Sequence, residues 1–413
     1  MNDIQQEMPS GFIQTRIGKL QAELAAAGLG GMLLTQNIDL YYFTGSMQNG
    51  YGFVPAQGDP VFYVKRSFLR AGWESPIRVK ELGSFRQFRR TLESDFPAVF
   101  AVEELQIAAD LDVMPAQLYM RLADLLADNA GGSSRTIVTL KDGSSIIRKL
   151  RMSKSDWEIA RIEAAAAVVD EALTAALNEL REGITELEWM ARIEYELRVR
   201  GHIGLMRMRG YNQEIATGML LSGPEAAIPS YFDGPAGGLG LGAAFPQSVS
   251  RKPIRRNEPI LIDVGCCIDG YVIDQTRTAV IGKLTEELAD AYAASEAILR
   301  DAEKRMTAGS PCSSLYERSL EMAKEFGLHE HFMGFGADQA KFLGHGIGLE
   351  VDEWPVLAKG FDLPLAEGMV IAVEPKFTFP GKGVVGIENS YLITNESPRP
   401  LTRTKEGLII IGT

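Results

Sequence analysis

Two aspartates occupy positions in an apolar stretch where the side chains of a β-strand usually pack into a core. Asp263 and Asp274 lie within residues 260–281, a mostly apolar run interrupted by Asp269-Gly270. An Asp-Gly pair between two such runs is a strong signal for a β-hairpin turn. A hairpin folded about residues 267–270 makes the two aspartates direct or diagonal neighbours on one face. Carboxylates so placed must share a proton, contact a cation or bind a metal ion.

The aspartate pair has an interpretation without metal. One aspartate would be held by hydrogen bonds in the turn, and the other would form an ion pair with Arg277. This stretch alone does not decide between an ion pair and a metal ligand, so the remaining chain has to be considered.

A second carboxylate pair and one histidine favour the metal interpretation. Glu374 and Glu388 lie in apolar runs on either side of a predicted turn, Pro380-Gly381-Lys382. A turn centred at residue 381 pairs positions that sum to 762, which places the two glutamates opposite each other. His345 lies between two glycines, which let the backbone approach closely. Four carboxylates and an imidazole match the ligand set for two divalent ions.

The N-terminal third predicts a small α/β domain, residues 1–150. A helix is expected over residues 12–28 and another near 113–128. Strands are expected at 32–34, 41–43, 98–102 and 136–140, with a hairpin around 56–59. Strands that alternate with helices indicate an α/β domain.

Residues 151–413 predict a larger α+β domain that carries the candidate ligands. Ser153 and Asp156 begin a long helix, and Thr185 and Glu188 have capping-box spacing for the next one. A strand near 215–221 and helices over 285–306 and 313–326 complete the pattern. The glycine-rich residues 234–242 are expected to form a flexible loop near the site, because no helix start follows them.

Composition excludes several classes of partner. The net charge is −12, with acidic residues spread along the chain, which argues against nucleic acid or an anionic membrane as the main partner. Three cysteines make a disulfide framework improbable. The first residues lack the pattern of a signal peptide, and no apolar run reaches the roughly 18 residues of a spanning helix. A cytoplasmic location is expected.

At these residues the chain resembles the creatinase/aminopeptidase P/prolidase superfamily, the "pita-bread" metallohydrolases of family M24. The resemblance is carried by residues 263–278 (DVGCCIDGYVIDQTRT), 344–349 (GHGIGL), 374–375 (EP) and 387–388 (IE). It implies a small creatinase-like N-terminal domain before a pita-bread catalytic domain, and a homodimer. It also implies two divalent ions (Mn, Co or Zn). The implied ligands are Asp263, Asp274, His345, Glu374 and Glu388.

The implied reaction is that of an Xaa-Pro aminopeptidase or Xaa-Pro dipeptidase. In these enzymes a hydroxide bridging two metal ions attacks the carbonyl of the Xaa-Pro bond, and the residue matching Glu374 handles the proton. The expected substrate is a small peptide or a peptide-like molecule.

Five positions depart from the pattern of that family. Ser230-Tyr231 stands where the family typically has His-Tyr, and Asp352 where it has His. Lys341 replaces another frequent histidine. Lys376 replaces the glycine of Glu-Pro-Gly, and Gly386 replaces an arginine.

These departures lead to separate predictions. Ser230 and Asp352 are predicted to be catalytic positions beside Glu374. Tyr231, Lys341 and Lys376 are predicted to bind substrate. An aspartate–lysine pair could substitute for a histidine donor; otherwise Asp352 and the two lysines are ordinary charges at the rim of the site.

Two other functions are compatible with the same fold. One is a metal-dependent hydrolase or lyase of a small non-peptide metabolite, such as a creatinase-like substrate. Creatinase, however, works without metal and uses a histidine at the position of Ser230. The other is a catalytically silent peptide-binding module, although such modules generally lose the ligands that are present here.

Overall fold

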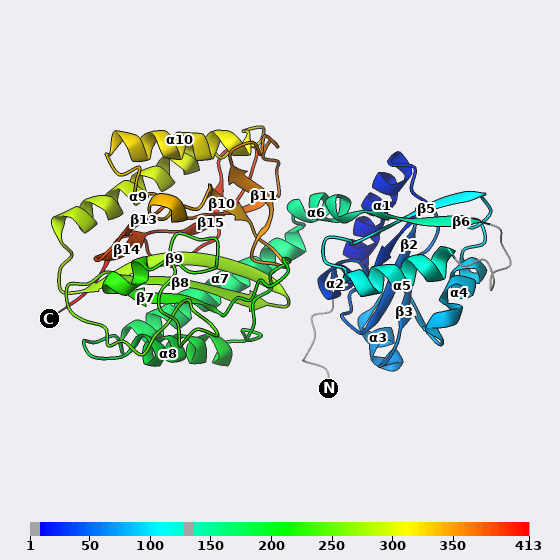
Figure 1. The fold of residues 1–413 in the computed structure, drawn as a ribbon, viewed down its shortest axis with the longest axis horizontal. Coiled ribbons are helices and arrows are strands. Elements are labelled where there is room, and N and C mark those ends of the chain that lie inside the picture. The colour runs from blue at the N-terminus through cyan, green and yellow to red at the C-terminus, as the bar shows by residue number, and fades with distance from the viewer. Residues whose placement is uncertain (1–8, 128–135, 413) are drawn as a thin grey trace. The chain divides into compact units, whose positions relative to one another are not determined.

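The computed structural model describes residues 9–127 and 136–412, and the chain forms two compact units, Met1–Leu150 and Arg151–Thr413. Each unit has its own buried core, so each is described separately (Figure 1).

The first unit is built on a six-stranded sheet with helices on both faces. The sheet order is β4-β3-β2-β1-β5-β6. Its strands are β1 (Gly31–Leu34), β2 (Gly50–Pro55), β3 (Val61–Val64), β4 (Arg78–Glu81), β5 (Glu104–Ala109) and β6 (Ile137–Asp142). The helices are α1 (Ser10–Ala26), α2 (Asn37–Thr44), α3 (Phe68–Glu74), α4 (Phe88–Asp95), α5 (Ala116–Ala127) and α6 (Ser144–Met152).

Two predicted strands of the first unit are wrong. Residues 41–43 belong to α2, which begins where the side chain of Gln36 accepts hydrogen bonds from two backbone amides and ends at Gly45 with φ +78°. The aromatic run resembles a strand in composition, but these end signals favour a helix. Residues 98–102 form turns, and the strand follows them at β5.

The second unit contains two sheets and a two-stranded ribbon. One sheet has the order β17-β9-β8-β7, the other β11-β10-β12-β15-β16, and the ribbon is β13-β14. The strands are β7 (Gly218–Ser222), β8 (Ile260–Ile268), β9 (Tyr271–Ile281), β10 (Phe342–Gly346), β11 (Glu353–Ala358), β12 (Val370–Val373), β13 (Lys376–Phe379), β14 (Gly383–Gly386), β15 (Asn389–Leu392), β16 (Arg399–Pro400) and β17 (Ile409–Ile411).

Four helices cover these sheets on two sides. In Figure 1, α7 (Asp156–Leu177) and α8 (Glu186–Val199) lie on one side, and α9 (Glu286–Arg305) and α10 (Cys312–Glu325) on the other. Capping boxes at Ser155 and Thr185 begin α7 and α8; the first cap is Ser155, two residues after the predicted Ser153. This mixture of helices and mostly antiparallel sheets confirms the predicted α+β class for the second unit.

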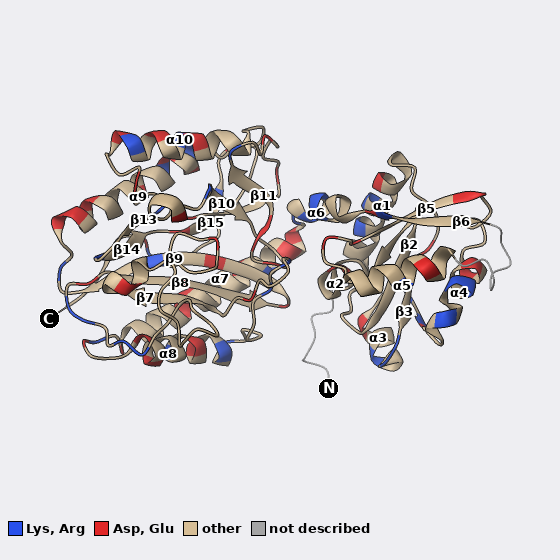
Figure 2. Cartoon of the chain, viewed as in Figure 1, with Lys and Arg blue, Asp and Glu red and all other residues tan. Residues whose placement is uncertain are grey.

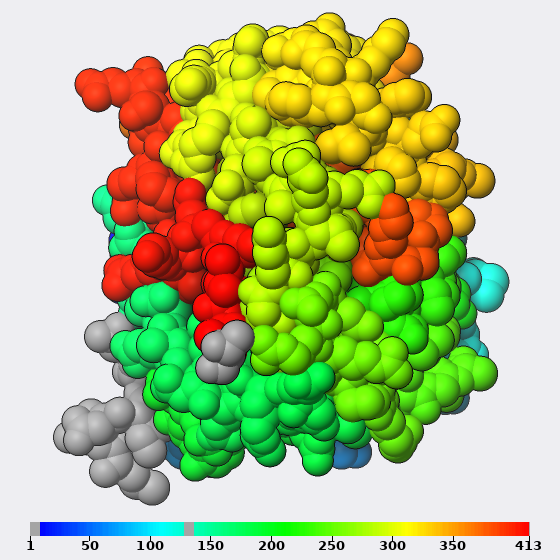
Figure 3. Space-filling view, turned by 90° about the vertical axis from the view of Figure 1, so that its left-hand side faces the viewer, coloured from blue at the N-terminus to red at the C-terminus, as the bar shows by residue number. Residues whose placement is uncertain are grey.

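Helices α9 and α10 carry charged side chains of both signs. Figure 2 shows acidic and basic residues interspersed along α9 and α10. The C-terminal segment, red in Figure 3, lies at the surface of this unit, where β17 pairs in parallel with β9. Among the described residues, every helix is too short or too polar to span a lipid bilayer.

The first candidate hairpin forms with a register shifted by one pairing step. Asp269 (φ +50°) and Gly270 (φ +89°) form a two-residue turn of the type that requires positive φ at both positions. Asp263 therefore pairs with Thr276, and Asp274 with Gly265. The two aspartates are diagonal neighbours on one face, not directly opposed, because the turn is centred one residue later than residues 267–270.

The second candidate hairpin has the predicted register. Phe379 pairs with Gly383 and Lys376 with Gly386 along β13–β14. The ladder β12–β15 continues the same register, with Val373 opposite Asn389. Glu374 and Glu388 lie opposite each other at the junction between these two ladders.

Candidate metal centre

Five predicted ligand residues lie together within the second unit. Asp263 and Asp274 extend from β8 and β9, and His345 from β10; the two glutamates lie directly after β12 and directly before β15. All five are buried, with at most 9% of each residue exposed. Their donor atoms form two groups in which all atoms lie within 4.8 Å of one another. The groups are Asp274, His345 and Glu388, and Asp263, Glu374 and Glu388.

Glycines on both sides of His345 allow β10 to pack closely between β11 and β12. A Cβ at Gly344 would lie 2.1 Å from the carbonyl oxygen of Ala372, and one at Gly346 would lie 2.3 Å from that of Trp354. These distances are too short for any side chain, so the close approach of the neighbouring strands requires glycine.

Glu388 belongs to both groups, and its two carboxylate oxygens differ. Its Oε2 accepts hydrogen bonds from Thr276 Oγ1 at 2.8 Å and from Lys376 Nζ at 3.2 Å. Its Oε1 is buried and has no hydrogen-bond partner. A buried carboxylate oxygen without a donor is costly unless a cation binds it. Oε1 is therefore suited to a metal ion.

Arg277 positions the backbone of this cluster and does not neutralise its carboxylates. The guanidinium is fully buried and donates to the carbonyl oxygens of Thr276 and Glu388, both at 2.8 Å. It also donates to Asn389 Oδ1 at 3.0 Å and to the Thr404 carbonyl at 2.5 Å. The interpretation that Arg277 forms an ion pair with an aspartate of the hairpin is not supported by these contacts.

Lys376 occupies a position that differs from the expected rim of the site. Its side chain is 1% exposed, and Nζ donates to Asp263 Oδ2 at 3.0 Å, Glu374 Oε2 at 2.5 Å and Glu388 Oε2 at 3.2 Å. Its contacts are with three predicted metal ligands and not with Asp352. Lys376 therefore does not form the expected aspartate–lysine pair with Asp352, and a pair of Asp352 with Lys341 stays a prediction.

The pKa shifts follow from burial and from this lysine. Burial raises the pKa of Asp263 and of Glu374, and the ammonium of Lys376 opposes the rise. Burial together with the charges of Glu388 and Asp263 raises the pKa of Asp274 well above its ordinary value. Burial alone would lower the pKa of Lys376, but the three carboxylates around it outweigh burial and raise this pKa well above its ordinary value. Asp274 is thus the carboxyl group whose charge is least compensated.

Asp352 lies beside His345 and is in a position to fix its tautomer. Asp352 Oδ1 is 3.3 Å from His345 Nδ1, and the carbonyl of Gly346 is 3.1 Å from the same nitrogen. A proton on Nδ1 leaves Nε2 available for a metal ion. Burial would lower the pKa of His345, but Asp352, Glu374 and Glu388 together raise it.

Replacing Asp352 with alanine is expected to weaken divalent metal binding. Outer carboxylates that orient a ligating histidine typically contribute 10- to 100-fold in metal affinity. Because 46% of the Asp352 side chain is exposed, the expected loss is at the lower end, about 10-fold. Isothermal titration calorimetry measures this change, with Asp338→Ala, an exposed aspartate of the same unit, as the control. Equal affinities in both variants would contradict the orienting role.

The other predicted site residues lie outside the cluster. Ser230 is half-buried, and its Oγ accepts a hydrogen bond from the amide of Phe232 at 3.2 Å. Tyr231 is 54% exposed, and Lys341 is also exposed. No hydrogen bond or ion pair links any of the three to the five clustered residues in the described part of the chain. Their functional roles stay predictions.

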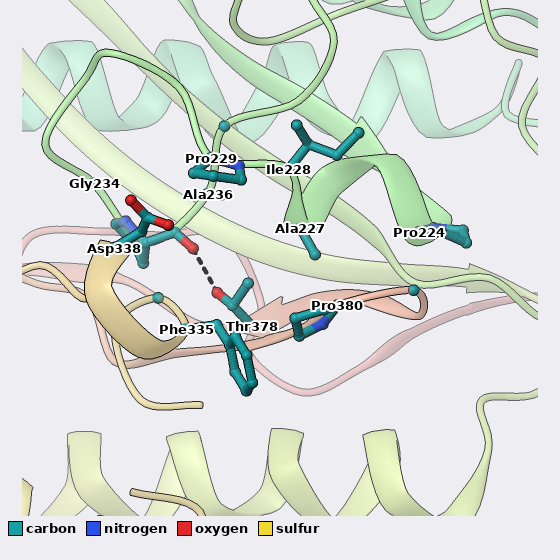
Figure 4. Close-up of a pocket in the computed structure, with 14 residues that line it drawn as sticks. Pro224, Ala227, Ile228, Pro229, Gly234, Ala236, Phe335, Asp338, Thr378 and Pro380 are labelled. Carbon is teal, nitrogen blue, oxygen red and sulfur yellow. Dashed lines mark hydrogen bonds between the residues drawn. The ribbon is translucent and has the colours of Figure 1, made fainter. Parts of the chain in front are cut away.

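A cavity of about 280 Å³ lies beside the segment that contains Ser230 and Tyr231. None of the five clustered residues lines this cavity. It is bounded by the segments 227–237, 334–338 and 378–381, including part of the glycine-rich loop. Figure 4 shows Ile228 and Pro229 on one side, and Phe335 and Pro380 on the other. The hydroxyl of Thr378 donates to the carbonyl of Pro235 at 2.6 Å and joins two of these segments. Sequence patterns gave no indication of Phe335 or Thr378.

The two ligand groups fit a metal ion unequally. Asp274, His345 and Glu388 offer two carboxylates, one of them with a partnerless oxygen, and an imidazole, which together suit a divalent ion. In the other group all three carboxylates already contact the ammonium of Lys376. The residues present therefore fit one ion, and the arrangement of Lys376 does not fit a second.

The two-unit architecture and the buried carboxylate–histidine cluster define a metal-dependent hydrolase with a pita-bread fold. Residues 160–395 match metallopeptidase family M24, and residues 16–153 match the creatinase/prolidase N-terminal domain. The chain belongs to metallopeptidase family M24.

Several relatives align over nearly the whole chain. The Xaa-Pro dipeptidase of Pyrococcus furiosus is 27% identical over 402 residues, which cover 96% of this chain and all of that protein. The probable dipeptidase PepE of Mycobacterium tuberculosis is 27% identical over 96% of both chains. The crystal structure of the prolidase from Pyrococcus horikoshii superposes with a TM-score of 0.78 at 27% identity, covering 96% of this chain and 100% of the other.

Proposed function

We propose that this protein hydrolyses the C–N bond of a dipeptide, a short peptide or a peptide-like molecule, as the names of its Xaa-Pro dipeptidase relatives suggest. The observation that carries the proposal is the convergence of Asp274, His345 and Glu388 in a buried site, with Glu388 Oε1 lacking a donor. Such a site is suited to metal-assisted hydrolysis.

The metal ion and the protein have separate tasks in this proposal. A divalent ion held by Asp274, His345 and Glu388 would polarise the substrate carbonyl and lower the pKa of water near it. Glu374 faces the same space, with Oε1 3.6 Å from His345 Nε2, and is proposed to take the proton from water and deliver it to the leaving nitrogen. The ammonium of Lys376 holds Glu374 Oε2 and so orients this carboxylate.

The cavity beside β13 is proposed to receive an apolar part of the substrate. Its lining includes four prolines and Phe335, and its 280 Å³ lies near the lower end of the range for ligand pockets. Thr378 lines it two residues along the same strand from Lys376. Ser230, Tyr231 and Lys341 are proposed to act around this cavity.

A metal-reconstitution assay tests the proposal. Purified, metal-stripped protein is loaded with Mn²⁺, Co²⁺ or Zn²⁺ in turn and assayed with Xaa-Pro dipeptides, longer X-Pro-Y peptides and non-proline dipeptides. We expect metal-dependent release of proline or of an N-terminal residue, and the cleaved length separates a dipeptidase from an aminopeptidase. Metal binding without cleavage of any peptide would reject a peptide substrate and favour a small non-peptide amide.

The finer expectations belong to this proposal as well. The identity of the metal ion, the homodimer and the cytoplasmic location are proposed from the resemblance to the family. The same metal series identifies the ion, and sedimentation analysis of the active protein tests the dimer.

A further inference from the structure

The ammonium of Lys376 lies where a metal ion bound by one ligand group would lie. Its three carboxylate contacts, at 3.0, 2.5 and 3.2 Å, are to Asp263, Glu374 and Glu388. These three residues are the complete second group of candidate ligands, with donor atoms within 4.8 Å of one another. Any ion coordinated by the group would have to displace the ammonium or stand next to it.

The lysine side chain is built into this position. Lys376 pairs with Gly386 across β13–β14, and a Cβ on Gly386 would lie only 2.5 Å from Lys376 Cγ. Any larger residue at 386 would push the lysine stem from its path, so the absence of a side chain there makes room for it. The lysine is therefore accommodated by its cross-strand partner and is not a surface side chain folded inward.

In the other ligand group, only Glu388 contacts a cation, through its Oε2 and Lys376 Nζ at 3.2 Å. Asp274 accepts a hydrogen bond from the amide of Gln275 at 2.9 Å, and Glu388 Oε1 has no donor. Asp274, His345 and Glu388 Oε1 therefore lie together with no ammonium or guanidinium group in contact with them in the described part of the chain. Carboxylate and imidazole donors in this arrangement favour one divalent cation.

The charge of the centre favours a single ion. Four ionised carboxylates carry four negative charges, and one ammonium with one divalent ion supplies three positive ones. Adding a second divalent ion beside the ammonium would make the centre positive and place two cations in contact in a buried region of low dielectric constant. The ammonium of Lys376 thus takes the place of a second divalent ion with a single positive charge, and it is part of the chain, so it does not have to be taken up from solution.

We propose that the centre holds one divalent ion, bound by Asp274, His345 and Glu388, and that the ammonium of Lys376 permanently takes the place of a second ion. This inference rests on the proposed function only in requiring a metal at the first group. It makes Lys376 a positioning residue for Asp263, Glu374 and Glu388, and it replaces the expectation of two divalent ions.

Metal counting tests the inference without any assay of activity. The full-length protein is stripped of metal, loaded with Mn²⁺ or Co²⁺, desalted and analysed by mass spectrometry of the elements. We expect about one ion per chain in the native protein and about two in Lys376→Gly, because this change removes both the cation and the stem that fill the second position. Lys341→Gly, which removes an exposed lysine of the same unit, should stay at one ion.

Several outcomes would overturn the inference. Two ions per chain in the native protein, or none, would do so, as would a folded Lys376→Gly variant that still binds one. If Lys376→Gly does not fold, anomalous scattering from crystals of the Co²⁺-loaded native protein decides instead. A single peak at Asp274, His345 and Glu388 is expected there, and a peak among Asp263, Glu374 and Glu388 would contradict it.

The result separates this inference from the proposed function. One ion per chain with no cleavage of any peptide would reject the proposed substrate and leave the lysine assignment intact. Cleavage of Xaa-Pro dipeptides by a protein that holds two ions per chain would support the proposed function and reject the lysine assignment.

Discussion

Replacing Glu374 with glutamine is expected to lower the rate of hydrolysis by about 10²- to 10⁴-fold, the usual contribution of a positioned general acid–base group. Glutamine keeps the shape of the side chain and an oxygen that can accept a hydrogen bond from Lys376. In the native protein, Lys376 Nζ lies 2.5 Å from Glu374 Oε2. It cannot take a proton from water. The unfolding temperature should change little, because the substitution removes one charge from a cluster of like charges.

Steady-state kinetics on the reconstituted variant measure this effect, and metal content is determined on the same sample. The bound ion should be retained, since Asp274, His345 and Glu388 are unchanged. Glu396→Gln makes the same chemical change at an exposed position of the second unit and should keep native activity. A Glu374→Gln variant with full activity would remove Glu374 from the reaction.

Replacing Glu353 with glutamine is expected to destabilise the second unit by about 3 kcal/mol near neutral pH, at the lower end of what breaking a buried ion pair costs. Glu353 is 8% exposed and contacts Arg151 at 2.5 Å and Lys154 at 3.1 Å. Its Oε1 also accepts from the amides of Leu349 and Glu350, at 2.9 and 3.1 Å. The variant removes one carboxylate from two buried cations, although Arg151 keeps its 2.8 Å contact with Glu350.

The effect has a defined dependence on pH. Burial would raise the pKa of Glu353, but Arg151 and Lys154 outweigh it and lower the pKa to about 2. A carboxyl group whose pKa is lower in the folded than in the unfolded state stabilises the fold at pH values above its unfolded-state pKa. This contribution is lost as the pH falls toward its folded-state pKa. The difference between native protein and variant should therefore be full above about pH 5 and shrink between pH 4.5 and pH 2.

Urea unfolding at a series of pH values, followed by a probe in the second unit, measures this difference. Glu287→Gln removes an exposed carboxylate that pairs with Lys382, and should change stability by less than about 1 kcal/mol at any pH. A Glu353→Gln effect that stays constant down to pH 3 would contradict the ion-pair explanation.

The two carboxylate hairpins were predictable because their turns have strong local signals. Asp269-Gly270 fixes a two-residue turn, and Pro380-Gly381 fixes the position of the other. The first register was misjudged by one step, since a turn is easier to recognise than its centre. The strand predicted at residues 41–43 failed for a different reason: end signals at Gln36 and Gly45 decided the structure over aromatic composition.

The position of Lys376 could not be read from local pattern, although two signals existed. Lys376 lies two residues from Glu374, so both side chains face the same side of an extended segment. The predicted register also placed it opposite Gly386, a partner without a side chain. What the sequence could not give is the distance from this strand to Asp263 on β8, which depends on the packing of two separate sheets.

Glu374 and Glu388 meet at a junction where the ladders β12–β15 and β13–β14 share one register. Successive residues of a strand face opposite sides, so a shift by one residue turns every side chain to the other face. Adding or deleting one residue in the turn at residues 380–382 would therefore move one glutamate out of the centre. In recombination or directed evolution of this chain, the length of a turn that contains no metal ligand therefore decides whether the two glutamates meet in the centre.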